Sequence, residues 1–268
     1  MKYALLDTDF ISKTHTVRLD DEHHLIDRVL DMPDYAFFCN EQTLKELRRH
    51  NMHAPSWLSQ KIEDGVIRVY SDEKIIEEMG TLYRNLCLLR YAEMLKTACN
   101  AFGADCFSKN YGRLDDIDLT EISKEDFINE LKDAESAIGG GNNLGEIKCF
   151  VLLQWLHTAM GDHLYYFCSD DKDARNGVLG IGDMNVRCVT LVSSLLRIIN
   201  ETNSHGDVLE PYAQAMLGYF DAHNRKTIRV VEASAVGRVE RVDCRRVLRE
   251  IFEDRFIELP NGFLKYKP

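Results

Sequence analysis

LYYFCSDDKDARNGVLGIG, the stretch from Leu164 to Gly182, runs from an apolar segment directly into a group of acids. The apolar part predicts a buried strand, and a short helix is expected over about 173–179. A second apolar segment, VRCVTL, and a helical pattern, VSSLLRIIN, follow it. This alternation predicts a parallel sheet with helices on its faces, so we expect an α/β fold.

The same alternation is present in the first third of the chain. Buried strands are predicted for YALL from Tyr3, for YAFFC and for VIRVY, with a helix near Glu22 to Asp31 between the first two. From 71 to about 137 the pattern is helical, which predicts a helical insertion. We therefore expect one domain over 1–200 and a C-terminal α+β elaboration over 201–268.

Composition restricts the class of protein. The chain has 268 residues, 45% of them hydrophobic, and a net charge of −11, which argues against a surface that binds nucleic acid all over. None of its eight cysteines form a Cys-x-x-Cys pair, and Cys39, Cys149 and Cys168 stand in apolar runs. Without a signal peptide or a membrane-length apolar run, we expect a cytoplasmic protein that does not enter membranes and has reduced core cysteines.

Acidic side chains follow the predicted strands where functional residues of an open parallel sheet gather. They are Asp7 and Asp9 after the first strand, Glu41 and Glu46 after the second, and Asp170, Asp171 and Asp173 after the strand of the opening stretch. Glu146 is expected in the first turn of a helix that follows a glycine-rich turn. Carboxylates that share a pocket have raised pKa values unless a cation neutralises them, and Mg²⁺ or Mn²⁺ prefers oxygen ligands. The acids therefore predict the metal site of a nuclease.

Four segments occur in an order that resembles the PIN-domain ribonucleases, a family that includes toxins of bacterial toxin–antitoxin pairs. They are LLDTDFIS, CNEQTLKEL, GGGNNLGEIKCFVLL and FCSDDKDARNGVLGIG, which cover roughly the first third and the stretch from Gly139 to about Leu196. The resemblance implies a three-layer α/β/α sandwich, an endoribonuclease activity dependent on Mg²⁺ or Mn²⁺, and an RNA substrate. It also implies an antitoxin or another regulatory protein as a partner, and a homodimer.

The resemblance assigns roles to particular residues. Asp7 matches the first acid of the family, Glu46 the second and Glu146 the third, while Glu41 could substitute for Glu46. The doublet makes the last acid ambiguous, with Asp171 preferred over Asp170. The expected metal ligands are thus Asp7, Glu146, Asp170 and Asp171. Ser169 matches the small hydroxyl residue before the last acid, and Asp9 and Asp173 are additional candidates. The insertion and the tail depart from the family and leave substrate and regulation open.

Two other interpretations stay open. A PIN-like domain without hydrolytic activity would be an RNA-binding or protein-interaction module. Alternatively, Asp7 and Asp9 form an Asp-x-Asp pair that resembles the first motif of haloacid-dehalogenase-type phosphatases, although Phe10 and Ile11 replace the expected Gly-Thr. Each acid taken alone also has a structural interpretation as a helix cap or as an exposed helix residue.

Arginines suggest where RNA would bind. Arg238, Arg241, Arg245 and Arg249 are three or four residues apart and would share one face if the segment were a helix. That face would be either a phosphate track or a solvated side paired with neighbouring acids. Arg48 and Arg49 are similar candidates nearer the acids.

Overall fold

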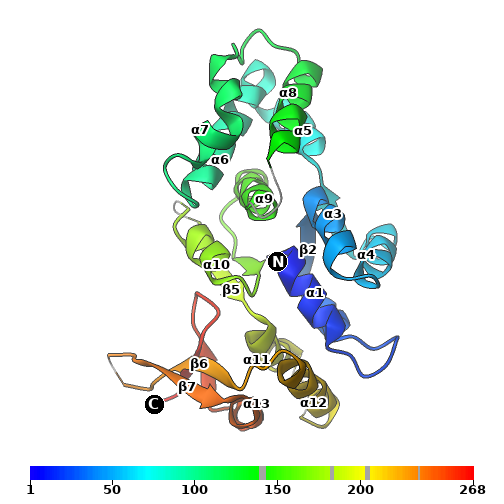
Figure 1. Cartoon of the computed structure of the whole chain (residues 1–268), viewed down its shortest axis with the longest axis vertical. Helices are drawn as coiled ribbons and strands as arrows, with labels where there is room; N and C mark the ends of the chain where they lie inside the picture. Colours follow the sequence, from blue (N-terminus) through cyan, green and yellow to red (C-terminus); the bar gives the residue numbers. More distant parts are fainter. Residues whose placement is uncertain (139–142, 182–183, 203–205, 235) are drawn as a thin grey trace.

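The computed structural model describes residues 1–138, 143–181, 184–202, 206–234 and 236–268. Its centre is an all-parallel sheet of five strands in the order β3-β2-β1-β4-β5 (Figure 1). The strands are β1 (Lys2–Leu6), β2 (Tyr35–Asn40), β3 (Ile67–Tyr70), β4 (Tyr165–Cys168) and β5 (Val186–Val189). The predicted α/β fold is confirmed, and every strand predicted for this sheet is present.

The first strand of the chain is the central strand of the sheet. Leu5 of β1 pairs with Phe38 of β2, and Leu6 pairs with Cys168 of β4. Successive side chains of a strand point to opposite faces, so Ala4 and Leu6 belong to one apolar cluster while Tyr3 and Leu5 belong to the other. Helices cover both faces, which gives three layers, and the carboxyl ends of β1, β2 and β4 lie side by side.

Seven helices connect and cover these strands among the described residues. They are α1 (Thr8–Thr16), α2 (Leu25–Leu30), α3 (Glu41–His50), α4 (Ala54–Glu63), α9 (Leu144–Met160), α10 (Lys172–Leu179) and α11 (Leu191–Thr202). The sequence pattern did not predict α1, and α2 is shorter than the helix expected from Glu22. The GGGNN turn before α9 lies largely outside the described residues.

The segment from 71 to 138 contains no strand, as predicted, and forms the helical layer at the top of Figure 1. It comprises α5 (Asp72–Tyr83), η1 (Arg84–Leu86), α6 (Cys87–Asn100), α7 (Cys106–Tyr111), η2 (Gly112–Asp116) and α8 (Lys124–Ala137). Lys148 of α9 is buried between this layer and the sheet and pairs with Asp72 at 2.7 Å and with Glu135. These ion pairs connect α9 to both ends of the insertion.

The C-terminal segment builds a second sheet of four strands in the order β7-β6-β9-β8. Its elements are α12 (Gly206–Ala222), β6 (Thr227–Val231), β7 (Val239–Asp243), α13 (Cys244–Phe252), β8 (Phe256–Glu258) and β9 (Leu264–Tyr266). The apolar cluster that contains Leu6 of β1 and Phe10 of α1 also contains Met216, Val247 and Leu264 of the C-terminal segment. The segment therefore packs into the main core.

The condition for a shared helical face of the four arginines is not met, because they do not lie on one helix. Arg238 precedes β7, Arg241 lies within β7, and Arg245 and Arg249 lie on α13. Pairing with β6 holds residues 239–243 extended, and Asp243 then caps α13 by accepting hydrogen bonds from two backbone N–H groups. The helix begins too late to include the first two arginines.

The turn between β8 and β9 covers the edge strand β5. The Cys188 backbone N–H donates a hydrogen bond to the Pro260 carbonyl at 2.7 Å. Gly262 has a φ of +78°, and a Cβ atom there would approach Thr190 Cγ2 to 2.9 Å. Only glycine suits this left-handed and crowded position. The C-terminal segment therefore closes one edge of the central sheet, where an unpaired strand would otherwise be exposed.

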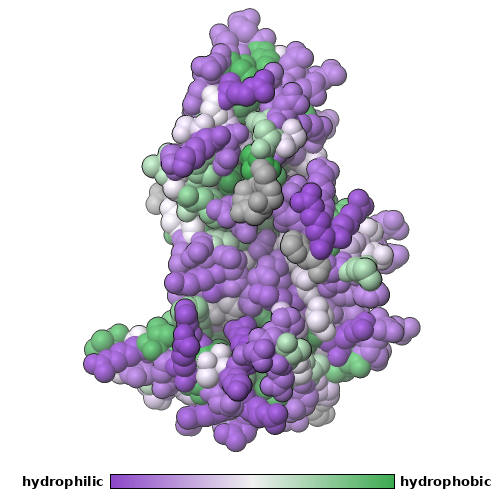
Figure 2. All heavy atoms as spheres, in the orientation of Figure 1, coloured by the Kyte–Doolittle hydropathy of each residue, from purple (hydrophilic) through white to green (hydrophobic). Residues whose placement is uncertain are grey.

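All eight cysteines are free, and Cys39, Cys149 and Cys168 are buried, as predicted. In the part of the chain that the structure describes, no helix has both the length and the apolar character needed to cross a bilayer. Figure 2 shows a hydrophilic band between the insertion and the C-terminal sheet. On this face, apolar side chains gather over the insertion and near the β6–β7 hairpin.

Candidate active site

Asp7 connects β1 to α1 at the carboxyl end of the central strand. One carboxylate oxygen accepts a hydrogen bond from the Thr8 backbone N–H at 2.8 Å, and the other accepts one from the Ser169 hydroxyl at 2.8 Å. The side chain is only 3% exposed. Burial, followed by the charge of Glu146, raises the pKa of Asp7 to about 8. A neighbouring cation would relieve this cost of holding a buried carboxylate.

Glu46 reaches the same place from α3. Its carboxylate accepts hydrogen bonds from the Thr8 hydroxyl at 2.9 Å and from the Gln42 side-chain amide at 3.1 Å. Gly145 of α9 lies against this carboxylate, and a Cβ atom there would come within 2.6 Å of its Oε2. A glycine at this position therefore lets the start of α9 approach Glu46, which also brings the next residue, Glu146, to the site.

Glu146 completes the group of acids that the sequence predicted at this edge. Burial is the main cause that raises its pKa, and the charges of Glu46, Asp171 and Asp9 raise it further. The side chains of Asp7, Asp9, Glu46 and Glu146 line one cavity of about 350 Å³. Four carboxylates from three parts of the chain thus meet, as expected from the order of the strands.

Asp9 and Lys13 form the side of this cavity that belongs to α1. The Lys13 ammonium contacts Asp9 at 2.8 Å and Asp170 at 3.3 Å. Burial lowers the pKa of Lys13, but Asp170 and Asp9 more than compensate, so the net pKa is raised and the side chain stays charged. Burial raises the pKa of Asp9 despite this ion pair.

The acids that follow β4 do not line the cavity. Asp170 accepts a hydrogen bond from the Leu191 backbone N–H at 2.8 Å and contacts Arg225 at 3.6 Å in addition to Lys13. Asp171 is exposed and caps α10 by accepting a hydrogen bond from the Ala174 N–H at 2.8 Å. Its charge nevertheless acts on Asp9 and Glu146. Asp173 is exposed on α10 and borders a different cavity.

The remaining candidates stand apart from the cavity. Glu41 pairs with Lys45 at 3.0 Å on α3, and its side chain is 44% exposed. Arg48 and Arg49 are exposed on α3 and do not line the cavity either. Ser169, in contrast, is fully buried and holds Asp7 in place. The structure thus groups Asp7, Glu46 and Glu146 and keeps Glu41 outside.

Four residues that line the cavity were not singled out from the sequence. They are Thr8, Ser12 and Lys13 of α1, and Tyr219 of α12. Ser12 and Lys13 lie three and four residues after Asp9 and so share its face of α1, which the missed helix would have indicated. Tyr219 comes from the C-terminal segment, and no local pattern points to it. Burial raises the pKa of its hydroxyl group.

The cavity offers oxygen ligands of the kind that the expected cation prefers. Among the described residues, no group of three or more His, Cys, Asp or Glu side chains is placed so that it could hold a metal ion as it stands. The chemistry of the cavity nevertheless fits Mg²⁺ or Mn²⁺, because its ligands are carboxylate oxygens and Asp7 is a buried acid with a raised pKa. Asp7, Glu46 and Glu146 would be its ligands only if their carboxylates moved closer together than the structure places them. Asp170 pairs with Lys13 and Arg225, and Asp171 caps α10, so neither of these two expected ligands lies at the cavity.

Comparison with protein-family models, with curated proteins and with solved structures gives no match for this chain.

Proposed function

We propose that the chain is a metal-dependent ribonuclease that hydrolyses RNA phosphodiester bonds in the cavity lined by Asp7, Glu46 and Glu146. The observation that carries this proposal is the convergence of these carboxylates, from β1, α3 and α9, on one cavity at the carboxyl end of the central sheet. The resemblance of four segments to PIN-domain ribonucleases supports RNA as the substrate. It also supports an antitoxin-like regulator and a homodimer as partners.

The residues of the cavity have distinct roles in this proposal. Asp7, Glu46 and Glu146 hold the cation, with the charge of Asp171 acting from outside the cavity. When bound, Mg²⁺ or Mn²⁺ would supply positive charge to the phosphoryl group and make water a better nucleophile. Ser169 and Thr8 hold the carboxylates of Asp7 and Glu46 in place through hydrogen bonds. Lys13 lines the cavity as a charged group that can contact a phosphoryl oxygen.

The geometry does not favour the phosphatase interpretation. Asp9, the second acid of the pair, contacts Lys13 at 2.8 Å. The chain also departs from the phosphatase motif, because Phe10 and Ile11 replace the expected Gly-Thr after the Asp-x-Asp pair. Release of phosphate from small phosphomonoesters, with no shortening of RNA, would reverse this assignment.

A cleavage assay tests the proposal directly. Single-stranded RNA, hairpin RNA and single-stranded DNA are incubated with EDTA, Mg²⁺ or Mn²⁺. We expect metal-dependent RNA cleavage that falls by at least about a hundredfold in Asp7→Asn, because a ligand is lost. Asp171→Asn tests the acid that acts from outside the cavity and should lower the rate less. Asp173→Asn changes the same charge on α10 away from the cavity and should cleave like the parent.

Two results would count against the proposal. If Asp7→Asn cleaves as fast as the parent, the carboxylate cavity is not the active site. If the chain binds RNA but cleaves none of the substrates with either metal, the non-hydrolytic binding module becomes the better interpretation.

A further inference from the structure

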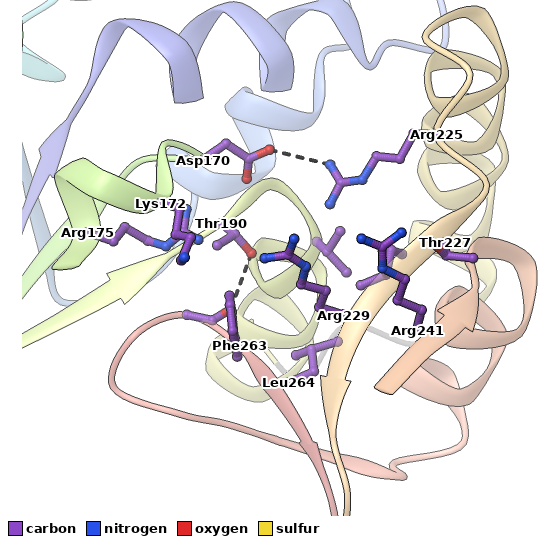
Figure 3. Close-up of a pocket in the computed structure, with 13 residues that line it drawn as sticks. Asp170, Lys172, Arg175, Thr190, Arg225, Thr227, Arg229, Arg241, Phe263 and Leu264 are labelled. Atoms are coloured by element: carbon purple, nitrogen blue, oxygen red, sulfur yellow. Dashed lines mark hydrogen bonds and ion pairs between the residues drawn. The ribbon is translucent and has the colours of Figure 1, made fainter. Parts of the chain in front are cut away.

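A second cavity, of about 340 Å³, lies between the parallel-sheet core and the C-terminal segment (Figure 3). Its walls come from the start of α10, from the residues after β5, and from β6, β7 and the turn before β9. Five cationic side chains line it, from α10, β6, β7 and the loop between α12 and β6. We call it the basic pocket, and its cations are Lys172, Arg175, Arg225, Arg229 and Arg241.

The positive charge of the basic pocket is poorly compensated. Asp170 is the one acid that lines it among the described residues, and it is shared between Arg225 at 3.6 Å and Lys13 at 3.3 Å. Lys172, Arg229 and Arg241 form no ion pair with any residue that the structure describes. In Figure 3 these side chains extend into the same space from opposite sides. A folded chain with a net charge of −11 has many acids that could have paired with them.

Two of the arginines are held next to each other by strand pairing. Arg229 of β6 lies directly opposite Arg241 of β7 in the antiparallel register. Like charges at such positions destabilise a sheet. An anion bound between them would convert this repulsion into attraction, whereas water would only screen it.

Arg175 forms the fixed base of the basic pocket. It is only 5% exposed, and its guanidinium group donates hydrogen bonds to the Asn261 carbonyl at 3.1 Å and the Ser169 carbonyl at 3.0 Å. These are neutral acceptors, so the positive charge is buried without a carboxylate partner among the described residues. A planar guanidinium held in this way is prepared for phosphate oxygens.

We propose that the basic pocket binds a phosphate-dense anion, a phosphomonoester or polyphosphate group carried by a nucleotide. Five cations and one shared acid leave several positive charges in the pocket, which is more than the single negative charge of a backbone phosphodiester would neutralise. A phosphate group with several negative charges matches this pocket better. The partly exposed ring of Phe263 lines the same pocket beside Arg175, with 5.9 Å between the guanidinium and the ring centroid. Such a ring can stack on a base, which favours a nucleotide over inorganic phosphate.

The same phosphate chemistry is available from two sources, a free nucleoside polyphosphate or the phosphorylated end of an RNA strand. The site is separate from the carboxylate cavity, so its binding is independent of hydrolysis. The two cavities are nevertheless neighbours, because Asp170 contacts Lys13 in one and Arg225 in the other.

Binding is measured by titration calorimetry and fluorescence anisotropy in EDTA, which prevents metal-dependent cleavage. The probes are inorganic pyrophosphate, a nucleoside triphosphate, and one short oligoribonucleotide with either a terminal phosphate or a terminal hydroxyl. The test variant is Arg229→Gln/Arg241→Gln. The control, Arg245→Gln/Arg249→Gln, removes the same charge from exposed positions on α13 outside the pocket.

We expect the test variant to bind the phosphorylated probes about a hundredfold more weakly than the parent, at about tenfold for each charged hydrogen bond lost. The control should stay within about twofold of the parent, and thermal melting should show both variants folded. Preference for the nucleoside triphosphate identifies a free ligand, and preference for the phosphorylated strand end identifies an RNA terminus.

The proposal is overturned if no probe binds the parent, or if the control loses as much affinity as the test variant. It is also overturned if the two oligonucleotides bind equally and the nucleoside triphosphate does not bind. Asp7→Asn should retain full binding. If the chain binds these anions but cleaves no RNA, the proposal for the basic pocket stands and the proposed nuclease function is contradicted.

Discussion

Gly145 is the residue on which the position of Glu46 depends most directly. Any side chain at 145 would enter the space of the Glu46 carboxylate, since a Cβ atom would lie 2.6 Å and 2.8 Å from its two oxygens. The carboxylate is held there by Thr8 and Gln42, so it cannot move without losing hydrogen bonds.

Gly145→Ala should therefore lower RNA cleavage by about tenfold to a hundredfold, because a shift of about 1 Å at a reacting group has effects of this size. The free energy of unfolding should change by less than about 1 kcal/mol, since alanine favours the helix. Gly218→Ala is the control, because Gly218 on α12 has no atom within 4 Å of the added Cβ. Equal activity of both variants would show that Glu46 tolerates displacement.

His15 makes stability depend on pH. Its ring is buried, with 3.9 Å between its centroid and that of His24, and burial followed by the charge of His24 lowers the pKa of His15 to about 4. The unfolded chain binds a proton near pH 6.5, so between about pH 6.5 and 4 it holds more protons than the folded chain. Stability is therefore present above this range and is lost as the pH falls through it.

His15→Phe keeps a stacked ring but removes the proton. On going from about pH 7 to about pH 4.5, the parent should lose on the order of 2 kcal/mol more stability than this variant. Urea denaturation at the two pH values measures the difference. An identical loss in both proteins would mean that His15 is not the group responsible.

The acids illustrate what the sequence could and could not specify at the scale of residues. Asp7 and Glu146 were identifiable because each follows a clear signal, a buried strand or a glycine-rich turn. The Asp170–Asp171 doublet was not resolvable, because the backbone places one acid at the start of α11 and uses the other to cap α10. Tyr219 reaches the cavity only through tertiary packing.

At the scale of elements, α9 is held to the helical insertion by a buried group of charges. Lys148 is only 2% exposed. Burial alone would lower its pKa, but Asp72 and Glu135 outweigh that effect and raise it, so the side chain stays charged.

Lys148→Met should destabilise the fold by about 3–5 kcal/mol, because two largely buried carboxylates, those of Asp72 and Glu135, lose their cation. Chemical denaturation measures the loss. Lys132→Met removes an exposed lysine that pairs with Glu73 at 2.5 Å and should cost little, as surface ion pairs contribute little. If both variants lose a similar amount of unfolding free energy, the ion pairs of Lys148 contribute no more to stability than an exposed ion pair does.

Element prediction succeeded where burial is continuous and missed α1, whose buried face includes the polar side chains of Thr8, Thr14 and His15. The strands of the central sheet are short apolar runs, and these were found. Residues 238–249 carry arginines at helical spacing, but spacing of charges without an apolar stripe does not specify a helix. Their conformation is decided by β6, whose pairing with β7 is not visible in the local sequence.

At the scale of the whole molecule, the C-terminal segment shares the core of the parallel sheet. Its apolar residues join those of β1, α1 and α11 in one cluster, and its β8–β9 turn covers β5. The boundary expected near residue 200 therefore divides a continuous apolar core.

A chain ending at residue 200 should lose its cooperative thermal transition, because it exposes apolar side chains that the full chain buries. Circular dichroism and binding of a hydrophobic dye report both changes. Supplying 201–268 as a separate chain should restore the transition. A fragment that melts cooperatively alone would show instead that the first 200 residues are an independent domain.

The order of the strands also has a consequence for synthesis on the ribosome. The central strand β1 is made before the other strands of its sheet, but its partner β4 begins at Tyr165, and Glu146 follows Glu46 by 100 residues. At about 5–20 residues per second, the ribosome takes about 5–20 s to span that interval. Tyr219 emerges later still. Nascent chains therefore lack a finished carboxylate cavity until Tyr219 has left the ribosome, and any hydrolytic activity can arise only after that point.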